Sequence, residues 1–148
     1  QPGDPVVLYS WEDGVDGWSP ANWQSDPGTL STGSTGATAG SSALQIASKG
    51  AWFGSPTQDP LLDLSARTSF AFDITTADVG TSVSVAVRNG SDWTWCQSSW
   101  TWVPAGTSEA MTVPLDTFGC DASGLTEVHD VLIYVSSGDF AIDRLTVS

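Results

Sequence analysis

Alternation of apolar with polar or small residues is the clearest pattern along this chain. It is unbroken in residues 69–74 (SFAFDI) and in residues 82–88 (SVSVAVR). Because successive side chains of a β-strand point to opposite faces, each segment is predicted to be a strand with one buried face. The side chains expected to point inward are Phe70, Phe72, Ile74, Val83, Val85 and Val87.

Further apolar segments of strand length are separated by turns rich in glycine, proline and serine. They are residues 6–11, 43–47, 109–115, 129–135 and 140–147. We also expect a short strand at residues 21–24, a long exposed loop over 26–42 with a strand near 29–31, and one helical turn at 125–128. No segment has sustained helical periodicity. The chain is therefore predicted to be all-β, a two-sheet antiparallel β-sandwich of the jelly-roll type.

Length and charge narrow the functional classes. The 148 residues suffice for one domain, expected over residues 6–148, with residues 1–5 as a linker remnant. A formal net charge of −13 with four Lys and Arg residues repels phosphate backbones, so nucleic acid and anionic membranes are poor partners. No apolar run is long enough to span a membrane. We expect a monomer that binds a neutral ligand, a cation or a basic partner.

Residues 93–102 (WTWCQSSWTW) hold four of the eight tryptophans. In an extended chain Trp93, Trp95 and Gln97 share one face, and Trp100 and Trp102 form a second same-face pair. Tryptophan is an unusual core residue, because it is large and its N–H needs a hydrogen-bond partner when buried. Tryptophan rings beside a polar amide suit a flat apolar ligand with polar edges, such as a sugar ring. The alternative is that these rings fill the interior of the sandwich.

The candidate binding site extends from this segment to other aromatic and polar residues. If the face opposite the valines of residues 82–88 is concave, Ser84, Arg88, Trp95 and Gln97 line a groove. Aromatic contacts worth about 0.5–1.5 kcal/mol each beyond area burial, with a few hydrogen bonds, give micromolar affinity at best. The complete candidate set is Trp23, Trp52, Arg88, Trp93, Trp95, Gln97, Trp100, Trp102 and Tyr134.

Two acidic residues lie near the ends of the chain, Glu12 after the first expected strand and Asp143 in the last. First and last strands are often neighbours in a sandwich, and two carboxylates meeting backbone carbonyls there make an oxygen-only site. Such ligands suit Ca²⁺ and not Zn²⁺. On so acidic a chain, two solvated acids explain the same residues.

The two cysteines, Cys96 and Cys120, are candidates for one disulfide, which fits a secreted protein. In the chain-entropy model that bond contributes about 3–4 kcal/mol of stability. Abundant Ser, Thr and Gly also favour an extracellular β-protein. The alternative is two unlinked thiols.

The sequence contains no recognisable catalytic motif. G-x-S-x-G, H-E-x-x-H, the P-loop and G-x-G-x-x-G are absent, and the single histidine, His129, has no motif context. We therefore expect a non-catalytic domain. A small β-jelly-roll glycoside hydrolase or lyase using a carboxylate pair is the alternative, because Asp and Glu are plentiful. A structural or adhesion domain whose tryptophans are all core is a third possibility.

Both ends of the chain resemble a known family. The opening LYSWEDG-VDGW resembles the F-E-D-G-x-x-G-W start of β-jelly-roll carbohydrate-binding modules attached to bacterial plant-cell-wall hydrolases, with Trp11 in place of the usual Phe. The closing FAIDRLTV resembles their terminal (F/Y)-x-I-D-x-(V/L) strand. The segments LLDLS and SVSVAVRNGSDWTWCQSSW also look like this group, so the resemblance spans nearly the whole chain.

The resemblance implies a structural Ca²⁺ away from the sugar. Its ligands would be Glu12, Asp143, the carbonyl of Ser10 and a loop carbonyl near residues 39–41, taken as Gly40. It also implies non-catalytic binding of one β-1,4-linked polysaccharide chain by a secreted module tethered to a glycoside hydrolase. β-Mannan or glucomannan is expected first, and cellulose-like β-glucan or xylan second.

Overall fold

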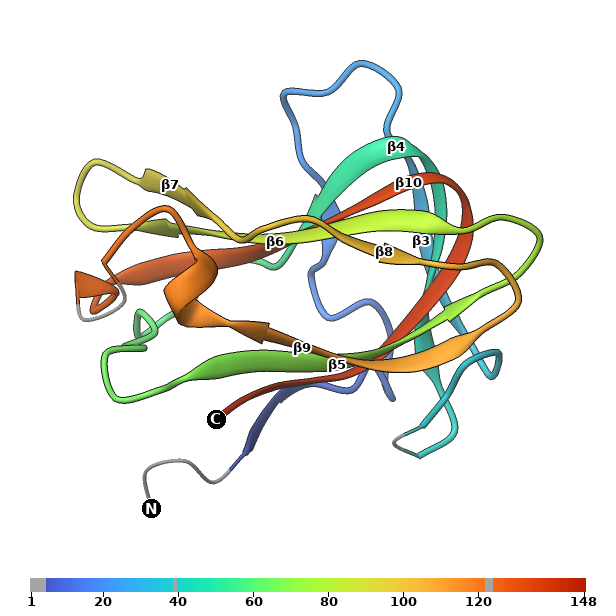
Figure 1. The fold of residues 1–148 in the computed structure, drawn as a ribbon, viewed down its shortest axis with the longest axis horizontal. Coiled ribbons are helices and arrows are strands. Elements are labelled where there is room, and N and C mark those ends of the chain that lie inside the picture. Colours follow the sequence, from blue (N-terminus) through green and yellow to red (C-terminus); the bar gives the residue numbers. More distant parts are fainter. Residues whose placement is uncertain (1–4, 39, 122–123) are drawn as a thin grey trace.

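The computed structural model describes residues 5–38, 40–121 and 124–148, and its strands form two layers (Figure 1). Residues 1–4 of the expected linker lie outside the described part. The strands are β1 (Val6–Tyr9), β2 (Ser19–Pro20), β3 (Gly28–Gly33), β4 (Ala43–Gly54), β5 (Ser69–Thr76), β6 (Thr81–Asn89), β7 (Thr94–Gln97), β8 (Thr101–Val103), β9 (Ser108–Pro114) and β10 (Val128–Val147). A short 3-10 helix, η1, covers Leu115–Thr117. The described residues contain no helix long and apolar enough to cross a membrane.

Two long strands, β4 and β10, pass through both layers and pair with each other along most of their length. In the first sheet, residues 51–54 of β4 and 128–135 of β10 lie between β2 and β6, and β6 carries β7 and β8 at its outer edge. In the second sheet, the other halves of β4 and β10 lie between β3 and β5, followed by β9. Strand β1 pairs antiparallel with the end of β10, so the first and last strands are neighbours. All pairings are antiparallel, and the predicted antiparallel β-sandwich is confirmed.

Strand β10 changes partner between Val135, which pairs with β6, and Phe140, which pairs with β5. Gly138 lies in this interval with φ of +146°, and a Cβ added there would lie 2.4 Å from Cγ2 of Val79. A side chain does not fit this position. The glycine therefore permits β10 to bend from one sheet into the other (Figure 1).

The core lies between the two sheets and is filled by the predicted alternating residues. The inward side chains of β5 and β6 are all buried, as the alternation requires: Phe70, Phe72, Ile74, Val83, Val85 and Val87. Trp11 and Trp18 are also buried, and each ring packs on Tyr9 with centroids 5.9 and 5.4 Å away. Within the described residues neither indole N–H has a hydrogen-bond partner, so these two tryptophans serve packing.

Two of three local predictions are wrong. Residues 21–24 form a turn and not a strand: after the Ala21 N–H bonds the Trp52 carbonyl, the remaining contacts with Trp52 come from the Gln24 side-chain amide. Within the stretch 26–42, the strand expected near residues 29–31 is confirmed as β3, which is six residues long and pairs with β4. Residues 125–128 are not helical, since the Leu125 carbonyl accepts a hydrogen bond from Leu64 N–H and β10 begins at Val128.

Candidate functional site

The outer face of the first sheet carries a row of mostly small residues across its strands. The strand register makes these residues cross-strand neighbours: Ser19 on β2, Gly54 on β4, Leu132 on β10, Ala86 on β6 and Gln97 on β7. Leu132 and Ala86 are buried, and together with Ala21 they form an apolar cluster separate from the core, against which Trp52 packs. The row is therefore a floor that aromatic side chains cover from outside.

Five rings gather above this floor, and we call them the aromatic cluster: Trp23, Trp52, Trp95, Trp100 and Tyr134. Trp52 is central, with its ring centroid 4.9 Å from Trp95, 5.5 Å from Tyr134 and 6.3 Å from Trp100. Trp95 also meets Trp23 at 5.7 Å, and Trp100 meets Tyr134 at 5.1 Å. Trp23 and Trp100 are both 53% exposed, so much apolar ring surface faces solvent. Large exposed apolar patches on a folded domain mark binding sites.

Local hydrogen bonds hold two of these rings in place. The Gln24 side-chain amide donates to the Trp52 carbonyl at 2.9 Å and accepts from the Trp52 N–H at 2.8 Å. This pair fixes the turn that carries Trp23 beside β4. The Trp95 indole N–H donates to Oε1 of Gln97 at 3.0 Å, as expected for neighbours on one strand face. The polar edge of Trp95 is thus satisfied while its ring stays exposed.

The disulfide lies on the opposite side of the same strand. Cys96 and Cys120 are bonded, with S–S 1.97 Å and Cα atoms 5.5 Å apart. Cys96 is buried and lies between Trp95 and Gln97 in the sequence of β7. The disulfide therefore ties β7 to the segment after η1. It therefore fixes the backbone that presents Trp95.

An ion pair between half-buried Arg88 and buried Asp130 borders the aromatic cluster. Nε of Arg88 donates to both carboxylate oxygens of Asp130, at 3.0 and 3.1 Å, and Nη2 donates to Oδ2. Asp130 is only 2% exposed, and its hydrogen bonds raise the pKa of Arg88 above its ordinary value. The guanidinium carbon lies 5.9 Å from the Trp23 ring centroid and 5.1 Å from that of Trp93, within cation–π range.

A polar cavity of about 160 Å³ opens between this ion pair and the turn after β2. Asn22 and Trp23 form one wall, and Arg88 and Asp130 another, with Leu132 beneath. Asp130 is the one carboxylate in the lining, and it is engaged by Arg88. A carboxylate pair of the kind used by glycoside hydrolases needs two acids, so the lining of this cavity does not supply one.

Three residues expected at the groove lie outside the aromatic cluster. Trp93 precedes β7 in a turn with φ of +53°, and its ring stacks on His129 at 3.7 Å instead of joining the aromatic cluster. Trp102 lies on β8 opposite Ser82 of β6. Its side chain is 63% exposed, and its ring lies over Gly80. Ser84 does not line a groove, because it is buried and its hydroxyl donates to the Ser98 carbonyl at 3.0 Å.

Sequence reasoning missed Asp130 and Asn22. Asp130, Leu132 and Tyr134 are alternate residues of one strand, so the face that carries Tyr134 also carries Asp130. That signal was present in the sequence. Asn22 lies in a turn, where no periodicity indicates the direction of a side chain.

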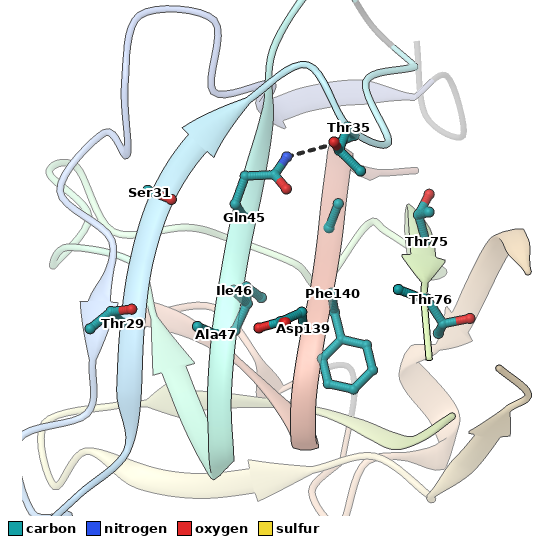
Figure 2. A pocket seen from close by; sticks show the side chains of 12 residues that line it. Thr29, Ser31, Thr35, Gln45, Ile46, Ala47, Thr75, Thr76, Asp139 and Phe140 are labelled. Atoms are coloured by element: carbon teal, nitrogen blue, oxygen red, sulfur yellow. Dashed lines mark hydrogen bonds between the residues drawn. The ribbon is translucent and has the colours of Figure 1, made fainter. Parts of the chain in front are cut away.

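A second, larger cavity of about 280 Å³ lies on the outer face of the second sheet. Figure 2 shows Thr29 and Ser31 on β3, Gln45 on β4, and Thr75 on β5 around it, with the Gln45 amide bonded to the Thr35 carbonyl at 2.7 Å. Its lining contains no tryptophan or tyrosine. None of the predicted binding residues lies there.

The two acids predicted as metal ligands, Glu12 and Asp143, both contact one loop beside the second sheet. The Glu12 carboxylate accepts backbone N–H bonds from Ser41 at 2.8 Å and Ser42 at 3.1 Å. Oδ2 of Asp143 accepts from Thr38 N–H at 2.7 Å, and Asp143 is fully buried. Residues 38 to 42 thus contact both acids, although residue 39 lies outside the described part.

This arrangement fits a hard cation. A Cβ added at Gly40, where φ is +79°, would lie 2.1 Å from Oε1 of Glu12, so only glycine lets the loop pass against that carboxylate. The side-chain donors are two carboxylates, which are hard oxygen ligands of the kind that Ca²⁺ takes, and the contacts they make here are with backbone N–H groups. Ser10 follows β1 directly. No group of three or more His, Cys, Asp or Glu side chains gathers among the described residues, so a cation here relies on backbone oxygens too.

Comparisons with known proteins agree with the fold. The family described as "Mannanase, galactose-binding domain-like" matches residues 9–139. No curated protein matches the chain significantly. Among solved structures, a family 11 carbohydrate-binding module from Clostridium thermocellum, in complex with a β-1,3-1,4-mixed-linked tetrasaccharide, superposes with a TM-score of 0.69 at 16% identity, covering 97% of this chain and 94% of that one.

Two xylan-related structures are similarly close. The family 22 xylan-binding domain from Paenibacillus barcinonensis gives a TM-score of 0.69 at 10% identity, covering 99% of this chain and 95% of that one. A Clostridium thermocellum endo-1,4-β-D-xylanase 10B fragment, complexed with xylohexaose, gives 0.67 at 17% identity. The match covers 97% of this chain and 28% of that chain, which joins a family 22 module to a catalytic module. At these identities the likeness establishes the fold.

Proposed function

Because the chain belongs to the family of mannanase galactose-binding-like domains, we propose that it is a non-catalytic carbohydrate-binding module whose aromatic cluster binds one β-1,4-linked glycan chain. The observation that carries this proposal is the exposure of Trp23, Trp95 and Trp100 over an apolar floor outside the core. Rings with satisfied N–H groups and free faces stack on sugar rings, whose C–H faces are apolar.

The charge of the protein supports a neutral glycan as the ligand. Arg88 is paired with Asp130, and the whole chain carries a net charge of −13. An uncharged polysaccharide escapes the repulsion that an acidic one meets. β-Mannan or glucomannan is the preferred ligand in our proposal, and β-glucan or xylan is the second choice, since the neighbours include a mixed-linked glucan complex and a xylan-binding domain.

The module is proposed to act within a larger secreted protein. The neighbouring xylanase structure joins such a module to a catalytic module in one chain. By this proposal the domain holds a tethered glycoside hydrolase close to its polysaccharide and acts as a monomer. The disulfide Cys96–Cys120 suits an extracellular location.

A structural Ca²⁺ is the second part of the proposal. Glu12 and Asp143 would supply carboxylate oxygens, with the Ser10 carbonyl and the loop at Gly40 as further ligands. The ion would tie the loop of residues 38–42 to strands β1 and β10, on the side of the second sheet. Bound there, it would stabilise the fold without touching the sugar.

Isothermal titration with mannohexaose, cellohexaose and xylohexaose in parallel tests the proposed function. We expect binding to one or two of them in the micromolar to millimolar range, with no new reducing ends in the same samples. Hydrolysis of any of the three oligosaccharides would contradict the proposal and show that the domain is an enzyme. Absence of heat with all three would return the aromatic cluster to a structural role.

A further inference from the structure

We propose that the polar cavity between Trp23 and the Arg88–Asp130 pair is the subsite that sets sugar specificity. It would take one neutral hexose unit, and Arg88 and Asn22 would read the configuration of its hydroxyl groups. This inference rests on the proposed function, because it assigns the cavity to the same glycan that the aromatic cluster holds.

The size and position of the cavity suit one sugar unit. Its volume of about 160 Å³ equals roughly five waters at about 30 Å³ each, which is room for one pyranose ring. The cavity begins where the floor reaches β2, at Ser19 and Gly54, and Trp23 links its wall to the aromatic cluster through Trp95. A glycan lying over the cluster therefore continues into it.

The absence of a side chain at Gly54 keeps the cavity open. A Cβ added there would lie 3.2 Å from Cγ of Leu132, closer than nearly all such contacts. The floor is thus as low as the backbone allows at this point.

The ion pair provides donors without net charge. Nε and Nη2 of Arg88 are used by Asp130, whereas Nη1 makes no hydrogen bond to any described residue. Its two N–H groups are therefore free to donate to hydroxyl oxygens. Because Asp130 cancels the charge of Arg88, the cavity favours a neutral hexose over a uronic acid.

Rigidity makes these donors selective. Buried Asp130 fixes the Arg88 guanidinium through a bidentate contact, and the rings of Trp23 and Trp93 flank the guanidinium. A group that is already ordered loses little entropy on binding, so a misplaced hydroxyl costs nearly the whole hydrogen bond. Ring stacking in the aromatic cluster has no such requirement, because it contacts the face of any flat sugar.

The test compares the ratio of two affinities across variants. Mannohexaose and cellohexaose differ in the configuration at C2 of each unit. The ratio of their affinities therefore reports how well the site recognises the hydroxyl configuration, while the mean of the two affinities reports ring stacking. We expect the unmodified protein to distinguish them by at least about fivefold, the value of one hydrogen bond. Asn22→Ala and Arg88→Lys should bring that ratio towards one.

The variants are chosen so that folding does not confuse the result. Lysine at position 88 keeps a cation for buried Asp130 but loses the planar fork of donors, and Asn22 is exposed. Trp100→Ala, in the aromatic cluster but outside the cavity lining, is the control: it should weaken both ligands equally and leave the ratio unchanged. Melting curves confirm that each variant is folded.

Two outcomes overturn the inference while leaving the proposed function standing. One is equal affinity of the unmodified protein for both hexasaccharides. The other is an unchanged ratio in both folded cavity variants. If the unmodified protein binds neither hexasaccharide nor xylohexaose, the proposed function itself fails.

Discussion

The outer faces of the two sheets are built by the same pair of strands and differ in almost every side chain. On the first sheet β4 and β10 present Trp52 and Tyr134, which are cross-strand neighbours. On the second sheet the same two strands present Gln45 and Ala141, again as neighbours. The backbone pairing is equivalent in both places. In our proposal, the difference in glycan binding between the two faces is therefore set by side chains and not by the fold.

The loops sharpen this difference. The first face gains Trp23 from the turn after β2 and Trp100 from the segment between β7 and β8. On the second face, the loop after β3 lies on the sheet instead: a Cβ added at Gly36 would lie 2.7 Å from the Ala141 Cβ. The second face has the larger cavity and no tryptophan or tyrosine in its lining (Figure 2). The proposed binding face is therefore not the face with the larger of these two cavities.

Removal of the disulfide should have the largest effect, and it should act on the first face. Replacing Cys96 and Cys120 by serine releases β7, which carries Trp95. We expect a loss of about 3–4 kcal/mol in the free energy of unfolding, measured by chemical denaturation, because the closed loop no longer limits the unfolded chain. Sugar affinity should fall as well. Unchanged stability in the double variant would show that the bond does not hold β7.

Chelation should act on the second face and spare the first. If Ca²⁺ binds at Glu12 and Asp143, a concentration one hundred times its Kd adds about 2.7 kcal/mol of stability, which EDTA removes. The melting temperature should fall by several degrees while sugar affinity at room temperature stays the same. Glu12→Gln is the matched variant and should lose most of the response to EDTA. A melting curve that does not move with chelator would contradict a removable ion.

Matched substitutions on β4 compare the two faces directly. Trp52→Ala removes the central ring of the aromatic cluster and should weaken glycan binding at least tenfold, about 1.4 kcal/mol. Gln45→Ala, on the same strand but on the second face, should leave affinity within about twofold. Isothermal titration measures both. A larger loss for Gln45→Ala than for Trp52→Ala would contradict our account, because it would place the glycan on the second sheet.

Trp102→Ala should have the smallest effect. This ring lies over Gly80 and makes no ring contact with the aromatic cluster among the described residues. We expect less than a twofold change in affinity and little change in stability, since the side chain is 63% exposed. A loss as large as that of Trp52→Ala would extend the binding surface along β8.

The fold and part of the site could be predicted from alternation. The valines of β6 point inward, so the opposite face of that strand carries Arg88, and Trp95 lies beside Arg88 across the strands. Alternation fails at Trp93, because a positive φ turns the chain there before β7 begins. It places Ser84 on the correct face but cannot show that Ser98 covers this residue.

Contacts between distant segments could not be predicted. The turn at Ala21–Gln24 carries Trp23 to the site only because the Gln24 amide bonds the backbone of Trp52. Two tryptophans of the opening segment, Trp11 and Trp18, have the same chemistry as Trp23 but are buried. Trp11 follows β1, which pairs with β10, and Trp18 precedes β2, which pairs with β4, so the positions of both depend on long-range contacts.

The most direct test of which face binds is an NMR titration that follows the eight indole N–H signals and the backbone amides. With mannohexaose, our account predicts large shifts for Trp23, Trp52, Trp95 and Trp100. It predicts small ones for the buried Trp11 and Trp18 and for the backbone of Thr29, Ser31 and Gln45. Shifts concentrated on those second-sheet amides, with the aromatic cluster unaffected, would contradict it.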